Sequence, residues 1–121
     1  MGYKDDIDKA LNGHGAWRQR LITVIATGNS DVQVAQIQVD NACNFGKWFY
    51  GLPADVRAQE ICKKVQKLHA DFHVEAAKVL GLGLAGKKAE AEKAMAFGGP
   101  FMDISGKLTL ALNQWKTVAP N

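Results

Sequence analysis

The sequence ICKKVQKLHADFHVEAAKVL, residues 61–80, repeats apolar side chains at steps of three and four. This spacing matches the 3.6-residue turn of an α-helix and places the apolar side chains on one face. The pattern begins near Asp55 and weakens toward Gly86. We therefore predict a long helix over residues 55–86. Its predicted buried face holds Val56, Ile61, Val65, Leu68, Phe72, Ala76, Val79 and Leu80.

Helical periodicity continues over most of the chain, with no internal repeat or low-complexity segment. It predicts further helices over residues 3–27, about 40–50, 87–96 and 100–118. Gly13 and Gly15 interrupt the first of these, and we interpret them as small residues that admit a close neighbour. The alternating segment 32–39 is interpreted as a short helix or loop, because a lone strand has nothing to pair with. These helices predict an all-α fold, an antiparallel four-helix bundle with an additional short helix.

Length and charge narrow the class of protein. With 121 residues the chain can form one core, so we expect residues 1–121 to be a single domain. The net charge is only +3, and basic residues alternate with acidic ones at helical spacing, which argues against a nucleic-acid partner. No apolar run approaches the ~18 residues needed to cross a membrane. We expect a cytoplasmic protein in which Cys43 and Cys62 are thiols or metal ligands rather than a disulfide.

The chain has three histidines, and two of them share a predicted helix face. His69 and His73 are four residues apart, so their rings can converge on one metal ion at Zn–N distances of about 2.0–2.1 Å. The same spacing also fits two solvated or hydrogen-bonded histidines on an ordinary helix. His14 lies on the apolar stripe of the first predicted helix, where it can be a core histidine or a third ligand.

Helix geometry separates the two cysteines as candidates for a fourth ligand. Cys62 lies on the same predicted helix as His73, but the rise between them is about 16 Å. A Zn–S bond of about 2.3 Å excludes it from the same ion. Cys43 lies in another segment, CNFGKW, and is free to approach. A set of three histidines and one cysteine would be tetrahedral and would suit zinc.

Patterns typical of metalloenzymes are missing from the sequence. A di-iron bundle uses Glu-x-x-His pairs, and a zinc hydrolase uses HExxH or an open coordination position beside a carboxylate. Asp71 lies between the two paired histidines in sequence, but it is rotated about 200° from His69 around the helix. We therefore expect no enzymatic activity.

Three motifs together resemble the chemoreceptor zinc-binding (CZB) domain family. They are His14-x-x-Trp17, Cys43-x-Phe45-Gly46-Lys47-Trp48 and His69-x-x-x-His73. Their order and gaps fit the family, and the closing ALNQWK segment is also similar. The resemblance spans about residues 5–117, and the cysteine segment is its most specific part. The residues expected to pack near the site are Trp17, Phe45, Gly46 and Trp48.

The resemblance implies a helical bundle that binds one Zn²⁺ through His14, Cys43, His69 and His73. In this family such domains stand alone or belong to bacterial cytoplasmic chemoreceptors and diguanylate cyclases, and some act as homodimers. The implied function is sensing of zinc or of oxidants such as hypochlorous acid, in chemotaxis or cyclic-di-GMP signalling, with Cys43 as the redox switch. The alternative is a helical protein-interaction module that zinc stabilises without any sensing. Asp40 is a candidate partner for a ligating histidine or a helix N-cap.

Overall fold

The computed structural model describes residues 2–119, and all the regular structure in this range is helical. The helices are α1 (Tyr3–Thr27), α2 (Val34–Gln38), α3 (Asn44–Tyr50), α4 (Ala54–Arg57), α5 (Glu60–Leu84), α6 (Lys88–Met95) and α7 (Pro100–Val118). The prediction of an all-α fold is confirmed. Within the same range none of the helices combines the length and the apolar character needed to cross a membrane.

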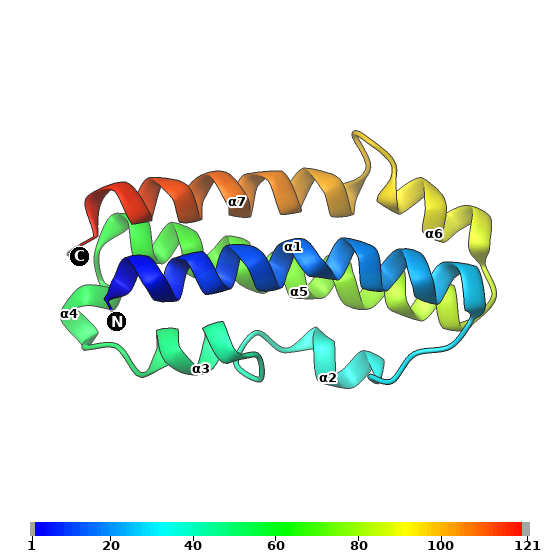
Figure 1. The fold of residues 1–121 in the computed structure, drawn as a ribbon, viewed down its shortest axis with the longest axis horizontal. Coiled ribbons are helices and arrows are strands. Elements are labelled where there is room, and N and C mark those ends of the chain that lie inside the picture. Colours follow the sequence, from blue (N-terminus) through cyan, green and yellow to red (C-terminus); the bar gives the residue numbers. More distant parts are fainter. Residues whose placement is uncertain (1, 120–121) are drawn as a thin grey trace.

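The two longest helices, α1 and α5, run in the same direction through the middle of the molecule (Figure 1). The segment from α6 to α7 returns along one side of them, and the segment from α2 to α3 returns along the other (Figure 1). Helix α5 contacts α1, α2, α6 and α7, so it is the central element of the packing. The side formed by α2 and α3 has no long helix, so this arrangement does not confirm the predicted four-helix bundle.

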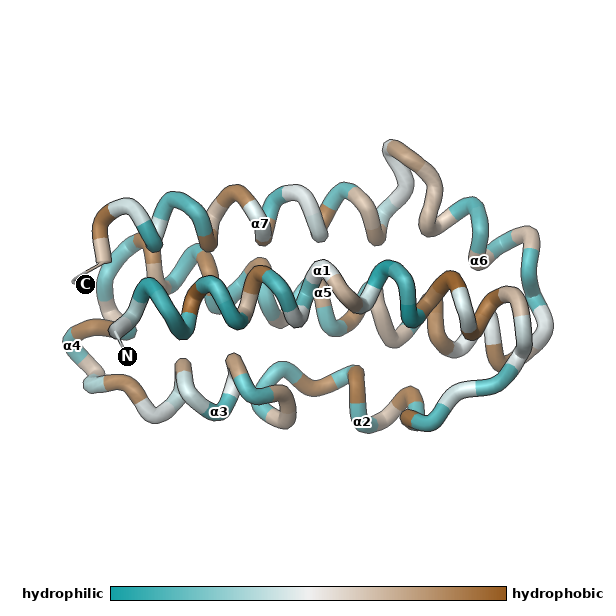
Figure 2. Tube along the Cα trace, viewed as in Figure 1, coloured by the Kyte–Doolittle hydropathy of each residue, from teal (hydrophilic) through white to brown (hydrophobic). Residues whose placement is uncertain are grey.

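Hydrophobic positions recur along α1, α5 and α7 between hydrophilic ones (Figure 2), as expected for amphipathic helices. On α5 the predicted apolar face is buried where it passes the centre of the bundle, and Val65, Phe72 and Leu80 have no exposed surface. Ile61 and Leu68 on the same helix are only partly buried. The core is therefore built around buried positions along the whole of the sequence quoted above, from Cys62 to Leu80.

Glycine and proline account for two helix ends that fall at the predicted residues 27 and 100. Helix α1 ends at Gly28, whose φ of 73° lets its N–H donate to the Val24 carbonyl at 2.7 Å. The chain leaves α6 after Met95, turns at Gly98 with a φ of 84°, and begins α7 at Pro100. Proline fits this first helical position because its missing N–H has no helical acceptor there.

The continuous helix predicted over residues 55–86 is wrong at its start. The chain forms the single turn of α4, adopts an extended conformation at Gln59, and begins α5 at Glu60. The acidic side chain of Glu60 favours a helix N-terminus at this point. Arg57 donates from Nε to the Leu52 carbonyl at 3.1 Å, which ties α4 to the turn after α3.

The interpretation of Gly13 and Gly15 is also wrong. Helix α1 is continuous through both, but a Cβ at either position would meet nothing within 4 Å. The close approach of α1 and α5 is made by Gly83, where a Cβ would lie 3.0 Å from Cγ1 of Val24. This contact was not predicted, because a sequence does not show which neighbour a glycine faces.

The open glycine positions give a test of the fold. Gly106→Ala on α7 should raise the free energy of unfolding by about 1 kcal/mol, because a Cβ there meets nothing within 4 Å and alanine is the better helix former. Gly28→Ala should lower it by about 1–2 kcal/mol, because alanine is strained at a positive φ. Urea unfolding followed by circular dichroism measures both changes. Two shifts of the same sign would contradict the assigned helix boundaries.

Candidate metal centre

Four side chains from three separate segments meet beside the middle of α5. They are His14 on α1, Cys43 at the start of α3, and His69 and His73 on α5. Each offers one donor atom, and the four atoms lie within 4.8 Å of one another. The structure therefore brings together the four residues that the sequence analysis selected as ligands.

The pair on α5 is the most enclosed part of the site. His69 and His73 are each 2% exposed, and their Nε2 atoms lie 3.0 Å apart. Nδ1 of His73 lies 2.9 Å from the carbonyl oxygen of Ile37, at the end of α2. A carbonyl only accepts hydrogen bonds, so Nδ1 of His73 carries the proton and Nε2 keeps a lone pair. A fixed tautomer of this kind orients a histidine for metal binding.

Cys43 approaches this pair from the segment that joins α2 to α3. It is the N-cap residue of α3, and its Sγ accepts a hydrogen bond from the Gly46 N–H at 3.3 Å. The same sulfur lies 3.4 Å from Nε2 of His69. Burial raises the pKa of the Cys43 thiol, although the nearby N–H groups of Gly46 and Phe45 oppose this effect. Without a cation beside it, the sulfur therefore remains a thiol at neutral pH.

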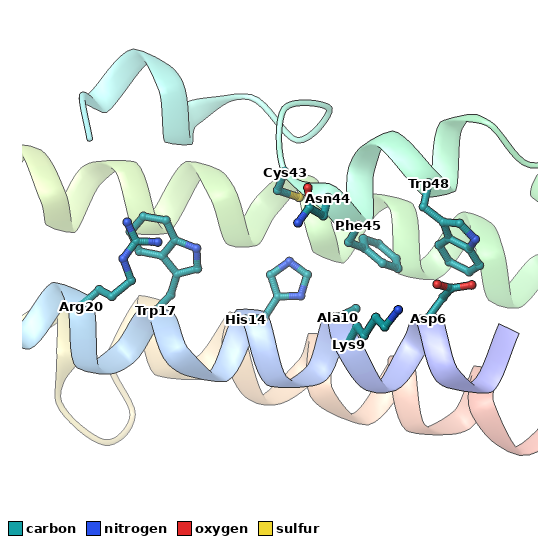
Figure 3. A pocket seen from close by; sticks show the side chains of 11 residues that line it. Asp6, Lys9, Ala10, His14, Trp17, Arg20, Cys43, Asn44, Phe45 and Trp48 are labelled. Atoms are coloured by element: carbon teal, nitrogen blue, oxygen red, sulfur yellow. The ribbon is translucent and has the colours of Figure 1, made fainter. Parts of the chain in front are cut away.

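His14 completes the group from α1, with its ring pointing toward α3 (Figure 3). The ring is buried against the edges of Phe45 and Phe72. Burial lowers the pKa of His14 to about 4, and burial also lowers the pKa of His69 and of His73. The three rings are thus neutral at neutral pH, which is the form that binds metals.

The donors fit a zinc ion. Nδ1 of His14 is buried, and it forms no hydrogen bond of ordinary geometry with the described residues. The backbone of Ala10 lies near enough to the ring to oppose the lowering of the pKa of His14 by burial. Three neutral imidazoles and one cysteine sulfur form a borderline-soft set that suits zinc better than magnesium or calcium. Their convergence from three segments is the arrangement that a structural or regulatory zinc site needs.

A cleft of about 300 Å³ between α1 and α3 leads to one side of this group. Its walls include His14, Cys43 and Phe45, and Trp17 and Trp48 lie toward its two ends (Figure 3). Cys43 is only partly buried and borders this cleft. A small molecule therefore has a path to the sulfur.

The four predicted packing residues have different surroundings. The ring of Phe45 lies 4.8 Å from that of His69, and a Cβ at Gly46 would overlap the carbonyl of Asp40. Trp48 packs against Tyr3 and Trp115, with ring centroids 5.7 Å and 5.6 Å apart. The Trp17 ring lies 4.0 Å from the guanidinium carbon of Arg20. Phe45 and Gly46 thus shape the site directly.

The residues set aside by the sequence analysis lie away from the four donors. Cys62 has no exposed surface and belongs to the apolar core. Asp71 is partly exposed and forms an ion pair with Lys67 at 3.0 Å. Both positions agree with the helix geometry used to exclude them from the site.

Two polar contacts beside the site were not predicted. The acceptor for His73 is the Ile37 main chain, which leaves no signal in the sequence. Asp40 is neither this acceptor nor the N-cap of α3, since Cys43 occupies the N-cap. The Asp40 carboxylate instead accepts a hydrogen bond from the Tyr50 hydroxyl at 2.6 Å.

Comparison with known proteins agrees with this geometry. A family model described as the chemoreceptor zinc-binding domain matches residues 14–80, more than half of the chain. The match begins at His14 and includes the other three donors. No curated protein and no solved structure is significantly similar to the chain. The chain belongs to the chemoreceptor zinc-binding domain family.

Proposed function

We propose that this protein binds one Zn²⁺ through His14, Cys43, His69 and His73 and uses Cys43 as a redox switch. The observation that carries the proposal is the convergence of four donors from three segments within 4.8 Å. Bound zinc would supply the positive charge that keeps the Cys43 sulfur a thiolate. Ligation by α1, α5 and the start of α3 would couple the packing of these segments to the metal.

The unequal exposure of the donors supports a redox role for the cysteine. His69 and His73 are almost fully enclosed, whereas Cys43 is partly buried and borders the cleft. A thiolate at this position can attack hypochlorous acid, giving a cysteine sulfenic acid and chloride. The sulfenic acid is a weaker ligand than the thiolate. Oxidation would therefore release the start of α3 from the histidines.

Contacts of α3 suggest how this release could affect the rest of the molecule. Trp48 on α3 packs against Tyr3 on α1 and against Trp115 on α7. Tyr3 begins α1 and Trp115 lies near the end of α7, and these two helix ends lie at the same end of the bundle (Figure 1). A displaced α3 would thus change the packing at the start of α1 and near the end of α7.

We further propose that the signal is zinc or an oxidant, in bacterial chemotaxis or cyclic-di-GMP signalling. The partner would be a chemoreceptor, a diguanylate cyclase or a second copy of this chain. Family membership and the motif resemblance support this part of the proposal. The protein would act in the cytoplasm without catalysing a reaction.

A second candidate function is a structural zinc site in a protein-interaction module. The burial of all three histidines favours this candidate, because enclosed sites with four protein ligands are typical of structural zinc. In that case the loss of Cys43 would change stability without changing any response to oxidants.

Metal titration tests the ligand set. Metal-free protein should bind one Zn²⁺ per chain, and Cys43→Ala should weaken binding roughly a hundredfold or more, since losing even an outer partner of a ligand costs about 10–100-fold. The matched control is Cys62→Ala, which removes the other thiol from the core and should keep wild-type affinity. Competition with a chromophoric chelator measures the affinities. Equal affinities for wild type and Cys43→Ala would remove Cys43 from the ligand set.

Oxidation separates the two candidate functions. One equivalent of hypochlorous acid should oxidise Cys43 of the zinc-loaded protein and release zinc, because the thiolate is both a ligand and the most accessible donor. Intact-mass spectrometry and a zinc indicator follow the two events. Cys62→Ala should respond like wild type. An unmodified Cys43 together with unchanged zinc content would exclude oxidant sensing and leave the structural role.

A further inference from the structure

The position of Cys43 depends on a loop, unlike the positions of the other three donors. His14 lies within α1, and His69 and His73 lie within α5, so helix packing fixes all three. Cys43 follows the irregular segment 39–42 between α2 and α3. Contacts made by this segment must therefore hold the sulfur at its 3.4 Å distance from His69.

Asp40 makes the contacts that tie this loop to α3. Its carboxylate Oδ2 accepts the hydrogen bond from Tyr50 Oη at 2.6 Å. Its carbonyl packs so closely on Gly46 that no Cβ would fit there. The same carbonyl lies 4.0 Å from Sγ of Cys43, which is long for a hydrogen bond even to sulfur. Asp40 thus contacts both Tyr50 at the end of α3 and Gly46 in its first turn, and the Gly46 N–H donates to the sulfur.

Tyr50 is suited to be a permanent donor in this contact. Burial and the Asp40 carboxylate raise the pKa of Tyr50 to about 12, so the phenol keeps its proton at any physiological pH. Gln66 on α5 is close enough to its hydroxyl to oppose this rise. The hydroxyl therefore lies where the loop, α3 and α5 come together.

We propose that Tyr50 is a positioning residue, which holds Cys43 in the metal site through its hydrogen bond to Asp40. The link to zinc rests on the proposed function, but the hydrogen bond and the loop geometry are properties of the chain itself. The bond restrains the loop whether or not the sulfur is bound to metal. It thereby limits how far Cys43 moves away from the histidines.

Alkylation of the metal-free protein tests this proposal without zinc. Tyr50→Phe should raise the rate at which iodoacetamide modifies Cys43 by roughly tenfold, because a hydrogen bond to a charged group contributes about that factor to an equilibrium. Peptide mass spectrometry distinguishes Cys43 from Cys62. Tyr3→Phe is the matched control, because Tyr3 packs on Trp48 by its ring and no hydrogen bond of its hydroxyl is found among residues 2–119. An unchanged rate in Tyr50→Phe, or an equal rise in Tyr3→Phe, would overturn the proposal.

Substitutions of Asp40 separate the hydrogen bond from the charge. Asp40→Asn and Asp40→Ala both remove the carboxylate charge, but only asparagine still accepts a hydrogen bond from Tyr50. Cys43 should be alkylated several-fold faster in the alanine variant than in the asparagine variant. Equal rates in the two variants would show that the hydrogen bond does not restrain the cysteine.

A double-mutant cycle shows whether Tyr50 acts through Cys43. Tyr50→Phe should weaken zinc binding roughly tenfold in the wild-type background and leave it unchanged in the Cys43→Ala background. Equal weakening in both backgrounds would assign Tyr50 a general structural role and overturn the proposal. If the wild type binds no zinc, the proposed function fails, and the alkylation rates still decide the role of Tyr50.

Discussion

The structure depends on the burial of three imidazoles against one another. Each ring has to remain neutral, and each nitrogen has to find a partner, because a buried unpaired polar group costs about 1–3 kcal/mol. The Ile37 carbonyl meets this need for Nδ1 of His73. The donor atoms that face one another at the centre of the site carry several lone pairs. The few protons on these groups cannot supply a hydrogen bond to every lone pair. A cation at that point would satisfy them together, and its binding would then contribute to the folding free energy.

This requirement also explains the short helices beside α1 and α5. A long helix on that side would have presented a regular face, with its backbone carbonyls used internally. The break between α2 and α3 instead leaves the Ile37 carbonyl free for His73 and places Cys43 at a helix N-terminus. Gly46 permits this path, since any side chain there would collide with Asp40. The irregular segment is thus needed for the site.

Helix periodicity was enough to predict that His69 and His73 share one helix face, but the assignment of His14 and Cys43 to the same site came from the family resemblance. His69 and His73 share a face because the rise and turn of a helix are fixed, and the same geometry excluded Cys62. The prediction failed for features of the fold that depend on the path of the main chain. The break before Glu60 and the contact between Gly83 and Val24 depend on which segments pack together. Tertiary packing of this kind is not encoded in local spacing.

The donors divide into a rigid group and a movable one. Three of them are held by helices of 25 residues, whereas the fourth begins a helix of 7 residues after an irregular loop. A change in the bonding of the site should therefore be taken up mainly by α3, which buries fewer residues than α1 or α5. Trp48 lies on that helix and packs against Trp115 of α7. In the proposed zinc site, the ligand most open to oxidation would thus also be the one whose displacement reaches the stacked rings of Tyr3, Trp48 and Trp115.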